Sequence, residues 1–327
     1  MLTMGQAINE ALREEMRRDE KVYIIGENVG TEGGVFRATS GLIEEFGEAR
    51  VKNSPLSETV IAGSSVGAAF FGYRPVAEIM MGDFMFVAMD EIVSKMGKWH
   101  YMHAGIKGMK LPIVVRTTIG GYSGSAAEHS QSPVSYFLHA PGLKIVVPST
   151  PYDGKGLLKT AIRDNNPVVF FEHRLLYRPT ARTFVPEEEY LIPFGVADIK
   201  RAGEDVTVVA TGFQVHLVLQ AAEALANEGI SVEVVDPRTL EPLDIETILQ
   251  SVRKTGRAVV VDEDHSRCGV AAEIATQIME GAFDYLDAPV KRVATENVPI
   301  PYALPMERRV LPSPERIIAA IKSVVQK

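Results

Sequence analysis

Glu58 is the first side chain in the sequence with the type and setting needed for proton transfer. It follows Pro55, Leu56 and Ser57, so it stands where a turn would pass into a helix. It could simply occupy the first helical turn, where the helix dipole stabilises a carboxylate and Ser57 is the N-cap. Alternatively, it faces a ligand at the carboxyl end of a sheet, where open α/β folds bind their ligands.

His129 is the second candidate. It lies in the segment 120–132, which is rich in Gly, Ser and Ala and is therefore predicted to be a loop. Histidine titrates near neutrality, so a loop histidine beside a cleft is suited to carry protons. The alternative is an ordinary hydrogen-bonded surface histidine. His100 and His103 could bind a metal, but no third ligand lies near them in the sequence.

A serine nucleophile is a further alternative. Gly63-Ser64-Ser65-Val66-Gly67 matches the pattern G-x-S-x-G of α/β-hydrolases. That motif needs a strong apolar strand directly before it, and the preceding stretch here is short and contains a carboxylate. A helix rich in small residues over 59–72 is therefore favoured over a hydrolase that uses Ser65. The sequence has no P-loop, and no G-x-G-x-x-G follows a strand.

The elements that must position these residues alternate between short apolar runs and amphipathic segments. In the first half we expect strands at 22–26, 74–80, 111–116, 143–147 and 168–172, and helices at 3–18, 40–46, 59–72, 86–102 and 153–164. In the second half we expect strands at 206–210, 232–236, 258–262 and 290–295, and helices at 215–228, 244–255, 270–281 and 314–325. This alternation indicates parallel sheets covered by helices on both faces.

The domain boundary is predicted at a proline-rich, acidic stretch. Residues 178–195 contain three prolines around the run 187–189 of glutamates, which is typical of an interdomain linker, although an ordinary long loop is the alternative. We therefore expect two α/β domains, 1–180 and 196–327, joined by a linker at 181–195.

Composition excludes several classes of protein. The 327 residues are 46% hydrophobic and 23% charged, with a net charge of −8 that argues against nucleic-acid binding. Cys268 is the only cysteine, so an intrachain disulfide and a cysteine-based zinc cluster are excluded. No apolar run approaches the ~20 residues that span a bilayer. The N-terminus lacks the pattern of a secretory signal, and we expect a cytoplasmic protein, in a prokaryotic cytosol or a processed organelle matrix.

Several short motifs occur in a fixed order along the chain. They include Gly26-Glu27 with its glycine loop, 54–58 (SPLSE), 72–75 (GYRP), 82–84 (GDF), 128–131 (EHSQ), 139–144 (HAPGLK), 163–168 (RDNNPV) and 234–240 (VVDPRTL). With this ordered set the sequence resembles, over essentially its full length, the β subunit of the E1 component of 2-oxo acid dehydrogenase complexes. That family is part of the transketolase-like superfamily.

The resemblance implies a fold, a cofactor and partners. The fold is a pyrimidine-binding α/β domain followed by a transketolase C-terminal-like domain, and the cofactor is thiamine diphosphate. The family's α subunit supplies the diphosphate and Mg²⁺ site with a G-D-G motif, where this chain has Gly82-Asp83-Phe84. An α2β2 heterotetramer with an E1 α subunit is therefore expected, together with a lipoyl-bearing E2 acyltransferase core.

The resemblance also implies roles for single residues. Glu58 matches the glutamate that hydrogen-bonds the pyrimidine ring nitrogen and so helps to activate the cofactor. Leu56 and Phe84 match residues that line the pyrimidine pocket. His129 matches the active-site histidine that moves protons and helps to acylate the lipoyl group. Residues matching a structural potassium site, which uses loop carbonyls, are Ile113, Ala161, Asp164 and Asn166.

The implied reaction is decarboxylation of a 2-oxo acid, with pyruvate as the first choice, and reductive acylation of lipoyl-E2. The preference for pyruvate or acetoin over branched-chain members rests on the stretch 172–177 and on Arg267-Cys268. Acetoin dehydrogenase and branched-chain 2-oxo acid dehydrogenase remain alternatives, as does a non-catalytic scaffold that docks E2. The E2 contact is expected on the C-terminal domain, at Glu280, Asp284, Asp287 and the helix 314–325.

Overall fold

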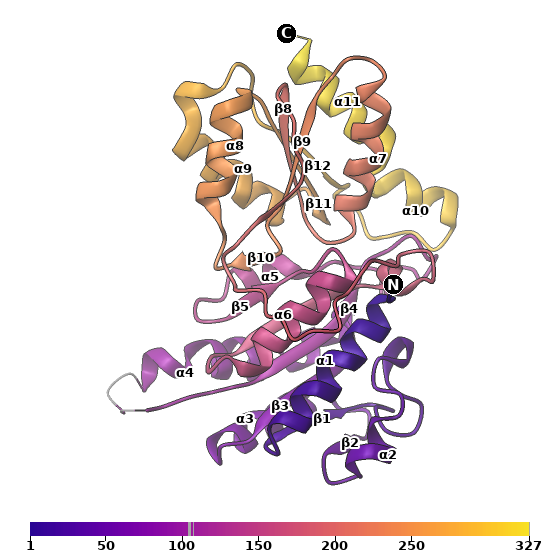
Figure 1. Cartoon of the computed structure of the whole chain (residues 1–327), viewed down its shortest axis with the longest axis vertical. Helices are drawn as coiled ribbons and strands as arrows, with labels where there is room; N and C mark the ends of the chain where they lie inside the picture. The colour runs from indigo at the N-terminus through magenta and orange to yellow at the C-terminus, as the bar shows by residue number, and fades with distance from the viewer. Residues whose placement is uncertain (104–105, 107, 327) are drawn as a thin grey trace. The chain divides into compact units, whose positions relative to one another are not determined.

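In the computed structural model, which describes residues 1–103, 106 and 108–326, the chain forms two units, each built around its own β-sheet (Figure 1). Unit 1 consists of Met1–Ile119 and Tyr136–Phe194, and unit 2 of Gly120–Ser135 and Gly195–Lys327. The loop that carries His129 therefore groups with unit 2, although the strand before it belongs to unit 1.

The sheet of unit 1 has parallel neighbours in the order β5-β6-β4-β3-β1-β2. The strands are β1 (Val22–Gly26), β2 (Val51–Asn53), β3 (Arg74–Met81), β4 (Val114–Ile119), β5 (Lys144–Val146) and β6 (Val168–His173). Helices on both faces bury most side chains of the central strands, which explains their nearly continuous apolar sequences.

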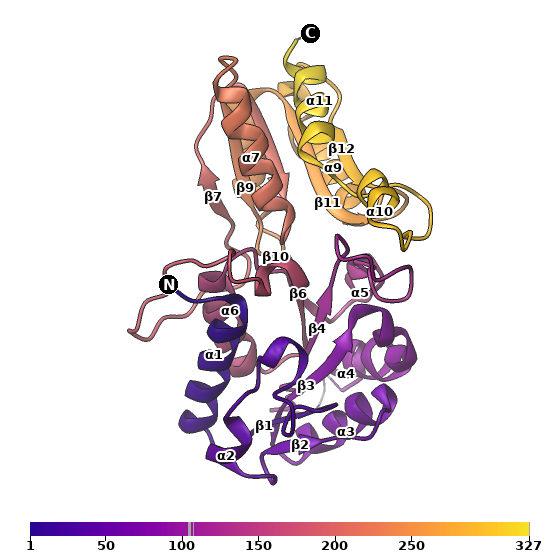
Figure 2. The same ribbon diagram turned by 90° about the vertical axis from the view of Figure 1, so that its right-hand side faces the viewer.

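Two helices cover each face of this sheet. Helices α1 (Met4–Arg18) and α6 (Pro151–Arg163) pack together on one face, and α3 (Glu58–Phe70) and α4 (Gly97–Met102) lie on the other (Figure 2). Shorter elements are α2 (Leu42–Phe46), α5 (Val134–Leu138), η1 (Val35–Arg37) and η4 (Arg174–Tyr177).

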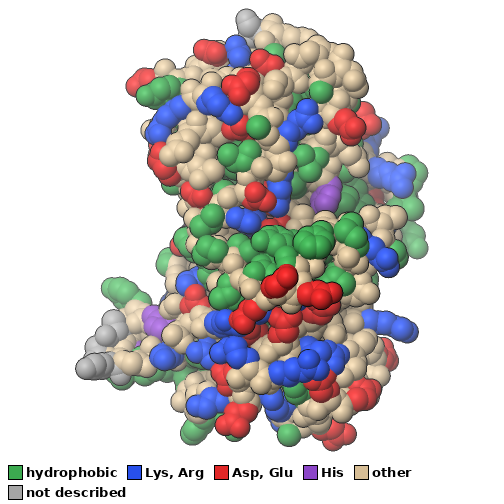
Figure 3. Space-filling model, viewed as in Figure 1, with side chains coloured by type: hydrophobic (Ala, Val, Ile, Leu, Met, Phe, Trp, Pro, Cys, Tyr) green, Lys and Arg blue, Asp and Glu red, His purple; other side chains and the backbone are tan. Residues whose placement is uncertain are grey.

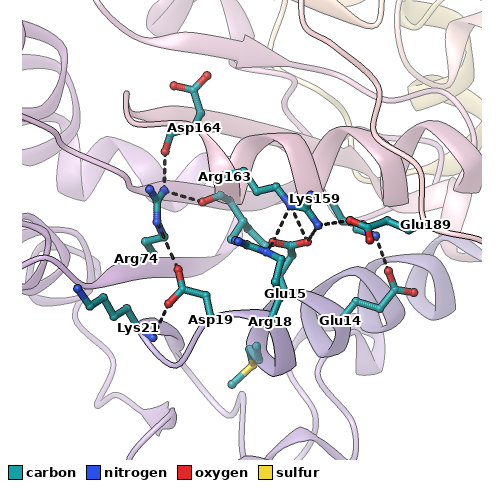
Figure 4. A network of polar contacts seen from close by, with 12 residues as sticks. Glu14, Glu15, Arg18, Asp19, Lys21, Arg74, Lys159, Arg163, Asp164 and Glu189 are labelled. Atoms are coloured by element: carbon teal, nitrogen blue, oxygen red, sulfur yellow. Dashed lines mark hydrogen bonds and ion pairs between the residues drawn. The ribbon is translucent and has the colours of Figure 1, made fainter.

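Charged side chains join α1 to α6. Lys159 is buried and pairs with Glu14 at 2.6 Å, and Arg163 pairs with Glu15 at 2.6 Å (Figure 4). Side chains of α1 also pack against the backbone of α6, since a Cβ on Gly154 would lie 2.5 Å from the sulfur of Met4. The sequence pattern places these helices correctly because each has a clear apolar stripe for the sheet.

The long helix predicted at 86–102 is the main departure in unit 1. The chain instead forms a 3₁₀ helix, η2 (Gly82–Ala88), a π-helix, η3 (Asp90–Met96), and then α4. Met85, Ala88, Ile92 and Met96 are buried, at spacings that suit one helical face. That spacing reveals a helical path but not its hydrogen-bond period, which tightens and widens along this stretch.

Strand β4 begins three residues later than predicted. Pro112 cannot donate a ladder hydrogen bond, so the strand begins after it. Leu111 and Ile113 are buried, but they lie outside the strand. The polar Thr117 and Thr118 are included instead, and both are buried.

Unit 2 has a mixed sheet in the order β12-β11-β8-β9-β7. Its strands are β7 (Asp198–Arg201), β8 (Val206–Ala210), β9 (Val232–Asp236), β11 (Ala258–His265) and β12 (Lys291–Thr295), and a short strand β10 (Thr239–Glu241) lies outside this order. All neighbours are parallel except β7, which runs antiparallel to β9. The sheet is thus mainly parallel, as expected, with one antiparallel strand at this edge, where the polar sequence Asp-Ile-Lys-Arg carried no strand signal.

Helices α7 (Gln214–Ala226) and α11 (Pro314–Val325) cover one face of that sheet, and α8 (Ile245–Thr255) and α9 (Val270–Ala282) cover the other (Figure 1). Short segments are η5 (Phe283–Tyr285) and α10 (Leu304–Val310), which sequence reasoning missed because seven residues are too few for a period. Ile317 and Ile321 of α11 are fully buried in the unit's core.

The surface mixes charges of both signs. Figure 3 shows acidic and basic side chains interspersed over the face that α1 and α6 form. Within the described part of the chain, no helix is both long enough and apolar enough to cross a bilayer.

Candidate active site

Three segments that follow neighbouring strands meet at one edge of the sheet in unit 1. Residues 27–34 follow β1, residues 54–57 follow β2, and η2 follows β3. These strands are parallel and adjacent, so their carboxyl ends share an edge, which is where α/β sheets bind ligands. The Ser54 N–H donates to the Gly26 carbonyl at 2.8 Å, and the Thr59 hydroxyl donates to the Val87 carbonyl at 2.9 Å.

Glu58 opens helix α3 at this edge and is only 7% exposed. Ser57 has an extended backbone, and its side chain makes no capping hydrogen bond. Ser57 is therefore the N-cap residue, as predicted, but it does not use its hydroxyl to bind the first helical turn. The carboxylate of Glu58 does lie in the first turn, as both interpretations required.

Glu27 is the second buried carboxyl group at this edge of the sheet, and the charge of Glu58 affects its pKa. It is also 7% exposed, and its Oε1 has no hydrogen-bond partner within the part of the chain that the structure describes. Burial and, after it, the charge of Glu58 raise the pKa of the Glu27 carboxyl. Sequence reasoning did not single out Glu27, although a carboxylate directly after the glycine that ends an apolar strand is a usable signal.

Glu27 is chemically suited to hold a proton. Burial disfavours the charged form of a carboxyl group, so the raised pKa of Glu27 favours its protonated form. A buried carboxyl oxygen without a partner is costly unless something donates to it. The site thus fits a ligand that brings nitrogen donors, such as an aminopyrimidine ring.

The loop after Glu27 is anchored on a buried side chain of β3. The Val35 N–H donates to Glu78 Oε1 at 2.9 Å. Gly34 has a φ of +69°, and a Cβ there would lie 2.5 Å from that same oxygen. Glycine is therefore required at Gly34 by both conformation and space.

Glu78 belongs to a buried network across three strands. It pairs with Arg116 of β4, whose guanidinium also binds Glu172 of β6 through two hydrogen bonds of 2.8 and 2.7 Å. The Tyr177 hydroxyl donates to Glu172. Burial, the largest effect, raises the pKa of the Glu78 carboxyl. Glu172 and Tyr177, which had favoured pyruvate in the sequence, thus serve the interior of the fold.

Leu56 and Phe84 lie on the segments that flank Glu58. Leu56 is 82% exposed and stands two residues before Glu58, and Phe84 is half-buried in η2. The structure therefore brings Leu56, Glu58 and Phe84 to the same sheet edge.

His129 lies in unit 2, within the segment 120–135. It is partly buried, and its backbone N–H donates to the Ala126 carbonyl at 3.4 Å. A shared site of His129 and Glu58 stays a prediction, because the two residues belong to different units.

The four residues expected at a potassium site lie in one hydrogen-bonded region. The Val168 N–H donates to the Ile113 carbonyl at 2.9 Å, and the Asp164 N–H donates to the Ala161 carbonyl at 3.2 Å. The Asn166 N–H donates to Asp164 Oδ1 at 2.8 Å.

A guanidinium already occupies part of this region. Arg74 donates to the Asp164 carbonyl at 2.9 Å (Figure 4). Each of these carbonyl oxygens has a second lone pair, and the potassium ion stays a prediction.

Two alternatives from the sequence are contradicted. Ser65 is fully buried in the middle of α3, where its hydroxyl donates to the Ile61 carbonyl at 2.8 Å, so it is not at a nucleophile elbow. His100 faces the Asn165 carbonyl at 3.3 Å, and His103 stacks on Trp99 with ring centroids 3.8 Å apart. Among the described residues, no group of three or more His, Cys, Asp or Glu could hold a metal ion.

Comparison with known proteins agrees with this arrangement. Residues 1–180 match the family model of the transketolase pyrimidine-binding domain, and residues 195–317 match that of the transketolase C-terminal domain. A solved split-gene transketolase, described as an inactive β4 tetramer, has the same fold. It aligns with a TM-score of 0.79 and 21% identity, over 99% of this chain and 98% of its own.

Three curated relatives match nearly end to end. The 2-oxoisovalerate dehydrogenase subunit beta of Bacillus subtilis is 47% identical, over 98% of this chain and 97% of its own length. The pyruvate dehydrogenase E1 component subunit beta of Rickettsia conorii is 47% identical over 99% and 98%. The acetoin:2,6-dichlorophenolindophenol oxidoreductase subunit beta of B. subtilis is 44% identical over 98% and 96%.

These identities are nearly equal, so they define the family and leave its substrate open. The chain belongs to the thiamine diphosphate-dependent, transketolase-like family of 2-oxo acid dehydrogenase E1 β subunits.

Proposed function

We propose that this chain, together with an E1 α subunit, decarboxylates pyruvate and reductively acylates the lipoyl group of E2, whose disulfide accepts the two electrons as the remaining two-carbon unit becomes an acetyl group. The observation that carries the proposal is the buried carboxyl group of Glu58 at the start of α3, at the carboxyl edge of a sheet whose domain matches a pyrimidine-binding family. Acetoin and branched-chain 2-oxo acids are the competing substrates.

The residues of unit 1 would bind and activate the pyrimidine half of thiamine diphosphate. When bound, the cofactor would supply a nucleophilic thiazolium carbon for chemistry at the carbonyl of the substrate. Glu58 would hold a proton at the pyrimidine ring nitrogen, and the raised pKa of Glu27 suits a second proton store beside it. Leu56 and Phe84 would enclose the ring, with Phe84 as an aromatic face. His129 would move protons during acyl transfer.

The α subunit would complete the site. Its proposed share is the diphosphate and Mg²⁺ site, because this chain has Gly82-Asp83-Phe84 in place of G-D-G. Support for a large subunit interface comes from exposed apolar side chains in unit 1, of which Leu56, Phe71 and Tyr101 are 82, 86 and 91% exposed. A structural K⁺ at the carbonyls of Ile113 and Ala161 and at Asp164 and Asn166 is part of the same proposal. The proposal also includes a location in the cytosol or an organelle matrix.

The proposed E2 contact is a groove between α9 and β12 in unit 2. The groove has a volume of about 460 Å³, and its lining includes Ala275, Met279 and Glu280. Glu280 and Asp284 are exposed, and Asp287 pairs with Arg257 at 3.2 Å. The groove lining carries one acidic and one basic side chain, Glu280 and Arg292, and the exposed Asp284 lies nearby in the sequence. This mixture of apolar and charged groups suits a partly apolar domain of E2 that pairs with Glu280, and its affinity should fall as salt rises.

Charge reversal tests this surface. We expect Glu280→Lys to weaken E2 binding several-fold, since an exposed ion pair contributes about 1 kcal/mol or less. Glu204→Lys is the matched control, because Glu204 is exposed on a loop of the same unit. Equal E2 affinities of the two variants, measured by calorimetry, would move the docking surface elsewhere.

The central experiment substitutes Glu58 in the assembled α/β enzyme. We expect Glu58→Gln to leave thiamine diphosphate bound and to slow exchange of the thiazolium proton by about 10²–10⁴-fold, because an amide cannot relay the proton. Glu32→Gln, an exposed residue of the neighbouring loop, is the control. Exchange at the wild-type rate in Glu58→Gln would remove Glu58 from the mechanism and favour the scaffold alternative.

The substrate is tested separately with the wild-type enzyme. We expect kcat/KM to be highest for pyruvate among pyruvate, 3-methyl-2-oxobutanoate and acetoin. A higher value for either of the others would reassign the substrate within the same family.

A further inference from the structure

The backbone of the His129 loop is held by a buried carboxylate of unit 2. Glu307 on α10 is fully buried. One of its oxygens accepts the Ser123 N–H at 3.3 Å, and the other accepts the Gly124 N–H at 3.0 Å. Each oxygen of Glu307 therefore holds one amide of the loop, an arrangement that only a carboxylate can provide.

Two acidic side chains of β11 hold the loop at its ends. Glu263 accepts the Gly121 N–H at 2.6 Å on one oxygen and the Gln214 side-chain amide at 2.7 Å on the other. Asp264 accepts the Ser135 N–H at 3.0 Å. Hydrogen bonds to charged acceptors are stronger than those between neutral groups, so these contacts fix the loop at its start, middle and end.

The backbone between these anchors has an unfavourable conformation. Tyr122 and Ala126 have φ values of +63° and +60°, which residues with side chains rarely adopt. The Tyr122 hydroxyl donates to the Pro312 carbonyl at 2.8 Å. A Cβ on Gly124 would lie 3.3 Å from the Tyr302 carbonyl oxygen. A backbone conformation of this kind persists only where surrounding contacts enforce it. Here the enforcing contacts come from unit 2.

We infer that Glu307 and Glu263 are positioning residues for His129, so that the C-terminal unit takes part in catalysis by fixing the loop that carries the histidine. The inference rests on the proposed role of His129. The carboxylates would act only through backbone N–H groups and would touch neither substrate nor cofactor. Loosening them should move the imidazole without changing how the 2-oxo acid binds.

Glu307→Gln is the sharpest substitution, because an amide keeps the size of the side chain but has one acceptor oxygen in place of two. Its NH₂ group would then face a backbone N–H. In the complex with the α subunit, we expect hydrogen–deuterium exchange of the Ser123 and Gly124 amides to become faster. Glu315→Gln, an exposed residue of α11, is the matched control and should leave that exchange unchanged.

Kinetics provide the second measurement. We expect Glu307→Gln to lower kcat for reductive acylation of lipoyl-E2 at least tenfold with KM for pyruvate unchanged, because misplacing a catalytic group by ~1 Å costs about 10²-fold. The double variant with His129→Ala should be no slower than His129→Ala alone, since the carboxylate acts through the histidine. If Glu307→Gln fails to fold, Glu263→Gln makes the same test.

Several results would overturn the inference. These are unchanged exchange at Ser123 and Gly124, a wild-type kcat in Glu307→Gln, or losses that multiply in the double variant. Wild-type turnover in His129→Ala would instead refute the proposed role of His129. The anchoring of the loop by Glu307 would then be decided by the exchange measurement alone.

Discussion

Removing Arg116 should destabilise unit 1 more than any other single change of a charged residue in its sheet. The Arg116 side chain is 2% exposed, and it is paired with Glu78 and Glu172, which are 3% and 0% exposed. In Arg116→Met the side chain still fills most of the space, but two buried carboxylates lose their common cation. The variant therefore isolates the electrostatic contribution from the packing.

The expected loss of unfolding free energy is that of breaking a buried ion pair. Breaking a buried ion pair by removing one partner costs about 3–5 kcal/mol, out of a total stability of about 5–15 kcal/mol. For a unit of this size each kcal/mol shifts Tm by about 2–4 °C, so we expect Tm to fall by about 6–20 °C. The loss should be smaller at pH 5 than at pH 8, because protonation of an unpaired carboxyl removes its buried charge.

The assay can follow unit 1 alone. Trp99 is the only tryptophan, and it stacks on Phe70 of the same unit with ring centroids 4.2 Å apart. Its fluorescence during urea unfolding therefore reports on unit 1. Arg17→Met is the matched control, because Arg17 is 61% exposed and its pair with Glu45 should contribute at most about 1 kcal/mol.

A rescue separates charge from shape. Replacing Glu78 and Glu172 by Gln in the Arg116→Met background removes the unpaired charges, so most of the lost stability should return. The reasoning is refuted if Arg116→Met unfolds within 1 kcal/mol of Arg17→Met at pH 8, or if the triple variant is less stable than Arg116→Met.

Two further predictions concern unit 2. Burial, followed by the charge of Asp264, raises the pKa of Asp262 to about 7. Between pH ~4 and ~7 the native state therefore holds a proton that the unfolded chain has released, and stability falls with rising pH by up to ~1.4 kcal/mol per unit. Asp262→Asn should reduce that slope, and parallel Tm–pH curves for wild type and variant would contradict this. Truncation after Pro312 removes Ile317, Ile321 and Val324 from the core of unit 2. Burial of each side chain stabilises the fold by about 1.5–3 kcal/mol, so unit 2 should unfold. A native circular dichroism spectrum of the truncated chain would contradict this.

The burial of α11 decides how the docking surface can be tested. The sequence predicted helix 314–325 as part of the E2 contact, and that stays a prediction. Its apolar stripe is buried against α7 and β12, so truncation cannot test docking, and the exposed Glu280 must be used instead.

The strands and most helices were predictable because their signals are local. Buried parallel strands are short apolar runs, and the helices that cover them repeat apolar residues every three to four positions. Local signals failed where neighbours decide the structure, as in the antiparallel edge strand β7 and the mixed helical stretch 82–102. The boundary at 181–195 and the roles of Leu56, Glu58, Phe84 and His129 stay predictions.

The sequence alone determined the family, since ordered motifs such as 54–58 and 128–131 can be read without coordinates, and it determined that Glu58 begins a helix. Only the tertiary structure decided which groups act together. Glu27 lies beside Glu58 because β1 and β2 are adjacent in the sheet, and Glu307 holds a loop 183 residues away along the chain. The physical reason is that the electrostatic effect of one charge on another group, and a hydrogen bond, both depend on distance in space, which sequence separation does not reveal.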